Sequence, residues 1–228
     1  CGPACLSLCQ DVQGETFDYP EEFFKERIHN IRRPRPDDFQ IKQAVEKIKN
    51  SKKPIIISGG GVFYSDAMEE LGNFAVKHNI PVTQTVMGYS TMKKDHSHFV
   101  GPIGGLGGKA ANNLAKETDL AICIGTKLAD FTTGSWANFE NPEFKLVSIN
   151  IARHDANKHL AEAVIGDAKV TLTELSNAIG DWKSSDSWHK KSQVELKSWN
   201  EYVDKESGPT NQELPSYAHA VGAIYRNS

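Results

Sequence analysis

The sequence predicts an α/β fold in which about six parallel strands form one doubly wound sheet with helices on both faces. Short apolar runs, typical of strands buried on both faces, alternate with amphipathic segments of helical length. Glycine clusters stand where two of these runs pass into predicted helices. Since parallel strands need helical crossovers between them, the alternation favours a parallel sheet. The predicted set has the size of a single Rossmann-like domain.

The composition excludes several classes of protein and of binding partner. The 228 residues are 39% hydrophobic and 24% charged, with a mean hydropathy of −0.47. These values exclude a disordered chain, and the longest apolar run is too short to cross a membrane. The net charge of −3 leaves no broad basic surface for nucleic acid or an anionic membrane. We therefore expect neither as a partner.

The amino-terminal segment reads as a fragment of something larger. Residue 1 is Cys1 rather than Met, and no signal-peptide pattern follows, so we expect a piece of a longer, cytoplasmic protein. Ala4–Leu8 is predicted to be a strand. Cys1, Cys5 and Cys9 are spaced by four, but no second Cys/His pair completes a tetrahedral metal site, and reduced cysteines are expected.

The next segments lead into the sheet. Residues 15–36 show little periodicity, and the prolines of Arg32–Pro36 favour an extended linker clamped to a neighbouring domain. Asp37 and Asp38 can cap the helix that follows. The isoleucine run Pro54–Ser58 then predicts the first fully buried strand.

The remaining elements repeat this alternation. The predicted strands are residues 54–58, 81–86, 98–101, 119–125, 146–151 and 163–166. Helices are predicted around residues 38–48, 67–78, 110–117, 170–182, 184–206 and 214–225. The helix at 184–206 has mixed charges and places Trp188, Leu196, Trp199 and Val203 inward. Residues 1–36 are predicted to be the end of an upstream domain followed by a linker, and residues 37–183 the sheet domain. Residues 184–228 are predicted to be a connecting helix, a linker and the start of a downstream domain.

Two glycine clusters, 59–61 and 101–108, mark the candidate ligand side of the sheet. Backbone N–H groups at a strand-to-helix turn can approach a phosphate closely. Tyr64 stands where a dinucleotide fingerprint needs its last small residue, whereas Gly105–Ala110 fits the permissive form but does not follow the first strand. Tight turns with close packing are therefore favoured over a bound nucleotide.

No catalytic or metal-binding set emerges from the residues themselves. His96 and His98 resemble paired ligands, but no third ligand stands nearby, and on a strand their rings would point to opposite faces. His154 and His159 lie in a polar segment and are also interpreted as loop histidines. Neither a catalytic residue nor a metal ligand is predicted in this chain.

The ordered motifs resemble the central domain of thiamine-diphosphate-dependent enzymes such as acetohydroxyacid synthase. The resemblance covers about residues 38–180. The motifs are Pro54–Val62, Ile80–Gly88, Asp95-His96, Ala111-Asn112, Thr118–Gly125, Lys127–Asp130, Ser148–Ile151 and Val164–Asp167. A stand-alone nucleotide-binding module and an acetohydroxyacid-synthase-like enzyme remain alternatives.

The flanks narrow the resemblance to one branch of that family. Gly2–Val12 looks like the last strand of the family's pyrimidine-binding domain, and Leu214–Gly222 looks like the start of its pyrophosphate-binding domain. Thr16–Phe24 and Arg32–Pro36 resemble the hydrolases of myo-inositol breakdown. The resemblance implies a parent enzyme that opens trihydroxycyclohexane-1,2-dione, a cyclic diketone, to a deoxyglucuronic acid.

The resemblance also implies that the cofactor sites lie outside this chain. The family's activating glutamate belongs to the pyrimidine-binding domain, and its Gly-Asp-Gly motif with a downstream Asn holds Mg²⁺ and the diphosphate. Gly166-Asp167-Ala168 and Gly180-Asp181-Trp182 lack both the third glycine and the Asn. We thus expect thiamine diphosphate and Mg²⁺ in a homo-oligomeric parent, held by the flanking domains, and an inactive fragment here.

Some members of the family hold FAD or ADP in the central domain. The positions that match their nucleotide crevice are Gly60, Gly61, Thr85, Met87, Gly125, Lys127, Asp130, Asn150 and Asp167. Lys127 stands where Arg is usual and loses its planar fork, while Asn150 replaces an acid. The crevice is therefore expected to be vestigial, without FAD.

Overall fold

The computed structural model describes residues 4–227 and divides the chain into two units, residues 1–33 and 34–228. The first unit contains only two short helices, α1 (Gln10–Gln13) and η1 (Glu21–Phe24). Its large apolar side chains are exposed, and four aromatic rings contact one another with centroid distances of 5.0 to 6.2 Å. These rings belong to Phe17, Tyr19, Phe23 and Phe24.

The prediction of a strand at Ala4–Leu8 is wrong, because these residues have no regular secondary structure. Leu6 is 81% exposed and Leu8 is 60% exposed, so neither residue packs against a second layer. A strand pattern is stable only when a neighbouring strand supplies backbone partners, and none pairs with this segment in the described residues.

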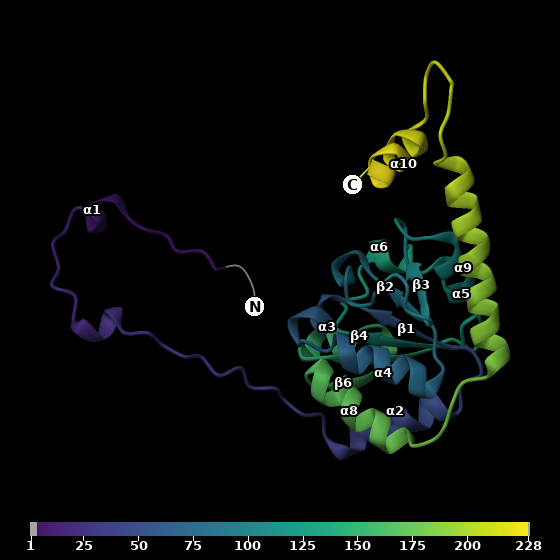
Figure 1. Ribbon diagram of the computed structural model, residues 1–228. Coiled ribbons are helices and arrows are strands. Elements are labelled where there is room, and N and C mark those ends of the chain that lie inside the picture. Colours follow the sequence, from purple (N-terminus) through teal and green to yellow (C-terminus); the bar gives the residue numbers. More distant parts are fainter. Residues whose placement is uncertain (1–3, 228) are drawn as a thin grey trace. The chain divides into compact units, whose positions relative to one another are not determined.

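The second unit is built on a six-stranded sheet in the order β3-β2-β1-β4-β5-β6, with every neighbouring pair parallel (Figure 1). This confirms the predicted fold class. The strands are β1 (Pro54–Ser58), β2 (Val82–Gln84), β3 (Phe99–Pro102), β4 (Leu120–Ile124), β5 (Lys145–Asn150) and β6 (Glu162–Ile165). β1 and β4 are fully buried, as expected for central strands covered on both faces.

Strand β2 ends earlier than predicted, and its side chains show why. Thr85 leaves the ladder to cap the short helix η2 (Val86–Gly88), and its hydroxyl accepts a hydrogen bond of 3.0 Å from the Gly88 N–H. The apolar Val86, which ends the predicted strand, is 58% exposed, and the adjacent Met87 is 74% exposed. Strand-like composition alone could not reveal this cap.

Helices cover both faces of the sheet (Figure 1). One face packs against α2 (Asp38–Lys49), α3 (Gly60–Tyr64), α4 (Met68–His78) and α8 (Ala168–Ile179). The other packs against α5 (Lys109–Glu117) and α9 (Asp186–Glu206). Ile56 faces the first layer while Ile55 and Ile57 face the second, which is the alternation that strand geometry imposes.

Short elements complete the unit. They are α6 (Asp130–Thr133), α7 (Arg153–Ala156), η3 (Lys158–Leu160) and α10 (Tyr217–Asn227). Residues 34 and 35 contact the sheet domain: the Pro34 carbonyl accepts a hydrogen bond from the Asp167 N–H, and Arg35 pairs with Glu174. In residues 4–227 no helix is both long and apolar enough to span a membrane.

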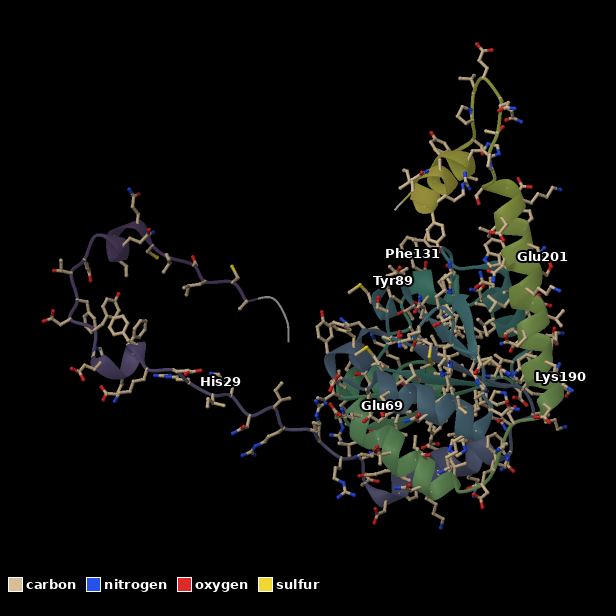
Figure 2. All side chains as sticks on the ribbon, viewed as in Figure 1. His29, Glu69, Tyr89, Phe131, Lys190 and Glu201 are labelled. Atoms are coloured by element: carbon tan, nitrogen blue, oxygen red, sulfur yellow. The ribbon has the colours of Figure 1, made fainter. Side chains whose placement is uncertain are left out.

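Helix α9 lies along one side of the sheet. Trp188 is buried, and its indole N–H donates a 2.8 Å hydrogen bond to the Pro54 carbonyl at the start of β1. Lys190 and Glu201 point away from the sheet (Figure 2). Val203, predicted to face inward, is 37% exposed, because the last turns of α9 extend past the apolar layer that holds Trp188.

Candidate functional site

The strand order places a topological switch point between β1 and β4, where the chain leaves the sheet in opposite directions. In open parallel sheets, ligands bind at the carboxyl ends of the strands beside such a point. All nine predicted crevice residues lie at carboxyl ends: they follow β1, β2, β4 and β6 or end β5. The structure thus brings the nine residues to one edge of the sheet.

The loops at the switch point contact each other directly. The Gly61 N–H donates a 2.9 Å hydrogen bond to the Gly125 carbonyl. A Cβ on Gly61 would lie 2.6 Å from the Gly125 Cα, and Gly125 has a φ of +60°. Both glycines are therefore needed for close approach of the two backbones, which is the packing role favoured from sequence.

The β1 and β2 loops meet in the same way. A Cβ on Gly60 would lie 3.0 Å from the Met87 carbonyl oxygen. Thr85 is buried and uses its hydroxyl to cap η2. The Met87 side chain is 74% exposed, so of this group it is the one free to contact another molecule.

Asn150 uses both ends of its side-chain amide inside the protein. Its Nδ2 donates a 3.1 Å hydrogen bond to the Thr126 carbonyl, and its Oδ1 accepts one of 3.0 Å from the Ala152 N–H. The residue is 9% exposed. The amide therefore ties the loop after β4 to the loop after β5, and a carboxylate in its place could not donate to Thr126.

The Asp167 side chain is also used in hydrogen bonds inside the protein. It caps α8 by accepting hydrogen bonds from the Lys169 and Val170 N–H groups at 3.0 and 3.4 Å. A Cβ on the preceding Gly166 would lie 2.8 Å from the Pro36 ring. The Gly-Asp pair therefore closes the domain against its linker.

Lys127 and Asp130 differ from the other crevice residues. Both are exposed, and among the described residues neither side chain has a hydrogen bond or an ion pair. They could meet a charged ligand without breaking an internal contact. The edge also carries exposed aromatic side chains, including Tyr89 and Phe131 on the outside of the body (Figure 2).

The second glycine cluster does not present an open helix N-terminus. The Gly108 N–H donates a hydrogen bond to the Pro102 carbonyl. A Cβ on Gly108 would lie 2.9 Å from the Trp199 indole nitrogen on α9. The cluster therefore serves close packing of α5 beneath α9.

The described residues do not fit the metal or diphosphate of thiamine-dependent catalysis. In residues 4–227 no group of three His, Cys, Asp or Glu side chains could hold a metal ion. Asp167 caps a helix instead, and Asp181 is exposed in the turn after α8. No catalytic step is assigned to this chain.

Sequence reasoning missed a histidine pair that the fold assembles. His98, just before β3, stacks on His189 of α9 with ring centroids 4.2 Å apart. His96 and His98 do not lie on opposite faces of a strand: β3 begins only at Phe99, and their centroids are 5.9 Å apart. His98 and His189 are distant in sequence, so no local spacing could have indicated the stack.

Two cavities lie away from the switch point. One of about 480 Å³ lies at the amino ends of β1, β4 and β5 and is lined by polar side chains that include Lys52, Asp119 and Lys145. The other, of about 430 Å³, is bordered by Trp136 and Phe144. Neither is lined by any of the nine crevice residues.

Comparison with known proteins gives the family. Residues 41–175 match the model of the thiamine pyrophosphate enzyme central domain. The 3D-(3,5/4)-trihydroxycyclohexane-1,2-dione hydrolase of Clostridium perfringens is 44% identical over 204 residues, which are 90% of this chain and 32% of that protein. The hydrolase of the same name from Bacillus anthracis is 39% identical over an alignment of 239 positions, which covers 97% of this chain and 36% of that protein.

The chain therefore spans about a third of the length of the curated relatives it matches. The family match covers more than half of the chain and coincides with the parallel sheet and its helices. The chain belongs to the thiamine pyrophosphate enzymes, of which it contains the central domain.

Proposed function

We propose that this chain is the central scaffold of a thiamine-diphosphate-dependent hydrolase that cleaves a ring C–C bond of trihydroxycyclohexane-1,2-dione. The observation that carries the proposal is the extent of the similarity to hydrolases of that name. It reaches 97% of this chain, well beyond the 41–175 span of the family's central domain. A scaffold common to the whole family would explain similarity in the sheet domain but not in both flanks.

The flanks are assigned to neighbouring domains of the same enzyme. Residues 1–36 would end the pyrimidine-binding domain and link it to the sheet domain at 37–183. Residues 184–228 would connect to the pyrophosphate-binding domain. The exposed apolar side chains of residues 4–33 and of α10 support this assignment, since such surface is usually covered by a partner.

Thiamine diphosphate and Mg²⁺ are proposed to bind in those neighbouring domains. The cofactor supplies the carbanion chemistry, and the protein positions it against the substrate. The role left to this chain is to hold its neighbours at a fixed separation. The rigid sheet, buried on both faces, suits that role.

The nine residues at the carboxyl edge are proposed to form a vestigial nucleotide crevice that holds no FAD. The internal bonds of Asn150 and Asp167 support this, because a nucleotide would have to compete with them. The purified chain should show no flavin absorption near ~450 nm after denaturation, because flavin is a bound chromophore with its own spectrum. A stoichiometric flavin band would contradict the proposal.

The parent enzyme is proposed to be a cytoplasmic homo-oligomer that takes a small cyclic diketone, with no nucleic-acid or membrane partner. The free thiols of Cys5, Cys9 and Cys123 suit a reducing compartment. Cys5 and Cys9 are exposed, and burial raises the pKa of the Cys123 thiol.

A domain exchange tests the proposed function. The matching segment of the Clostridium perfringens relative is replaced by this chain, and ring opening of the diketone is measured. We expect the chimera to keep activity within about tenfold of the parent, a barrier change near 1.4 kcal/mol. The control chimera carries the central domain of acetohydroxyacid synthase and should be far less active. Equal failure of two folded chimeras would contradict the specific assignment.

A further inference from the structure

Three histidines line one seam of the domain. On one side of the seam are the first turns of α9 and residues 180–185, which connect α8 to α9. On the other side are α4 and the segment before β3. His78 ends α4, His98 precedes β3 and His189 belongs to α9. His78 and His98 are buried, with 0% and 6% of their surface exposed.

The contacts of His78 fix the connection directly. Its Nδ1 lies 2.9 Å from the Trp182 carbonyl and therefore carries the proton, while Nε2 lies 3.2 Å from the Ser176 hydroxyl. The His78 carbonyl accepts a hydrogen bond from the Ser184 N–H. The neutral ring thus joins the end of α4 to both sides of the turn that leads to α9.

His98 is tied to the same connection through Asn79. Its Nε2 lies 3.2 Å from the Asn79 Oδ1, and the Asn79 amide nitrogen donates to the Ser184 carbonyl and to Asp186. Its Nδ1 lies 3.0 Å from the Ser97 hydroxyl. Because Asn79 Oδ1 can only accept, Nε2 carries a proton, and in the neutral ring Nδ1 accepts from the Ser97 hydroxyl.

His189 completes the seam from the α9 side. Its ring stacks on His98 at 4.2 Å with an angle of 20° between the planes, and its Nδ1 is buried without a hydrogen-bond partner. A protonated ring would bury an N–H donor with no acceptor and place a charge against the second ring. Both consequences disfavour the imidazolium form.

We propose that His78, His98 and His189 form an acid-sensitive clasp, which holds residues 180–189 against α4 and β3 when the rings are neutral and releases them when the rings are protonated. The clasp acts locally, because the contact between α9 and α5 contains no histidine. There Lys191 pairs with Glu117, and Glu195 accepts a hydrogen bond from Asn113.

The surroundings favour the neutral rings, although the hydrogen bond to the Trp182 carbonyl acts in the opposite direction and raises the pKa of His78. Burial is the main cause that lowers the pKa of all three histidines, and for His98 it acts with His189 and His96 to give about 4. Lys77 and Lys183 lower the pKa of His78 further, whereas Asp186 acts in the opposite direction on His189. Neither opposing influence reverses the direction, because the pKa values of His78 and His189 are still lowered.

The sign of the effect follows from these shifts. In the closed clasp the pKa of each ring lies below its ordinary 6.5, so the open form binds more protons once the pH falls below about 6.5. The clasp is fully closed above that pH and weakens as the pH falls toward 4. For His98 alone, the open population should rise roughly seventyfold between pH 7.5 and pH 4.5.

Hydrogen exchange of the 228-residue chain, followed by mass spectrometry and corrected for the intrinsic pH dependence of exchange, tests the clasp. Peptides covering 180–189 should exchange at least tenfold faster at pH 4.5 than at pH 7.5, while peptides from β1 and β4 stay protected. The paired variant His98→Gln, His189→Phe keeps a polar group at Asn79 and a ring on α9, and should lose most of the response. The control His154→Gln, at an exposed site on α7, should keep it.

Three outcomes would overturn the proposal. They are an unchanged exchange rate at 180–189, simultaneous loss of protection in β1 and β4, and an undiminished response in the folded paired variant. If the paired variant does not fold, NMR titration of the histidine rings in the unmodified chain decides. Titration of His78, His98 and His189 at or above pH 6.5 would contradict the clasp, and titration below pH 6.5 together with local opening would support it.

Discussion

At the scale of single residues, Asn150 shows how the carboxyl edge of this sheet is stabilised from within. The amide bridges the loops after β4 and β5 with one donated and one accepted hydrogen bond. The sequence marks this position only as an amide where relatives with a nucleotide have an acid. Its partners could not be predicted, because they depend on backbone positions that exist only after the strands pair.

Asn150→Asp should lower the free energy of unfolding by about 1–3 kcal/mol, because the carboxylate cannot donate to the buried Thr126 carbonyl. Urea denaturation at pH 7.5 measures the change. The matched control Asn157→Asp removes an exposed amide that donates to the Arg153 carbonyl, and should cost about 0.5 kcal/mol or less. Equal losses for the two variants would contradict the bridging role of Asn150.

The histidine seam marks the limit of sequence reasoning at the same scale. The sequence shows His96-Ser97-His98 as a motif, yet the ring that stacks on His98 is that of His189, which lies on α9. The stack requires the return of α9 along the sheet, which is a tertiary event. Local spacing therefore identified the histidine but not its environment.

At the scale of elements, the strands and helices of the sheet domain were predictable because each has a strong local signal. Pro54–Ser58 and Leu120–Ile124 are uninterrupted apolar runs, and both form fully buried strands. Asp37 caps α2 by accepting a hydrogen bond from the Gln40 N–H, as its position predicts. Ala4–Leu8 has the same kind of signal but no neighbouring strand, and forms none.

Contact between the loops after β1 and β4 should make Gly61 sensitive to the smallest substitution. Gly61→Ala would place a methyl group 2.6 Å from the Gly125 Cα and should cost about 1–3 kcal/mol of unfolding free energy. The control Gly105→Ala has no atom closer than 3.8 Å to the new Cβ and should be nearly neutral. Thermal and urea denaturation compare them; a Gly61→Ala variant as stable as the control would mean that the two loops are not in contact.

At the scale of the whole molecule, the chain combines one densely packed unit with a segment that buries almost nothing. The apolar layers on the two faces of the sheet lie within residues 34–228, whereas the described side chains before residue 33 are exposed. The two parts are similar in composition, so only the loss of periodicity and the paired prolines indicated the boundary between them. The assignment of each part to a domain came from the family resemblance.

Limited proteolysis should therefore remove the amino-terminal segment first. Exposed backbone without buried side chains is cut readily, whereas strands in a packed sheet are protected. At low protease concentration we expect early cuts before residue 36 and after residue 206, and a resistant fragment that contains 38–180. Mass spectrometry of the fragments identifies the sites. Early cleavage between Pro54 and Ile151 would show that the sheet domain does not fold as described.

We propose that this chain is a scaffold whose catalytic cofactor is held by neighbouring domains. Isothermal titration calorimetry of the 228-residue chain with thiamine diphosphate and Mg²⁺ tests it most directly, with the Clostridium perfringens relative as positive control. We expect a saturable heat for the relative and none for this chain, because its described residues offer neither a metal-binding group nor a free helix N-terminus for a diphosphate. Saturable binding by this chain with a dissociation constant near 1 μM, about −8 kcal/mol, would contradict the claim.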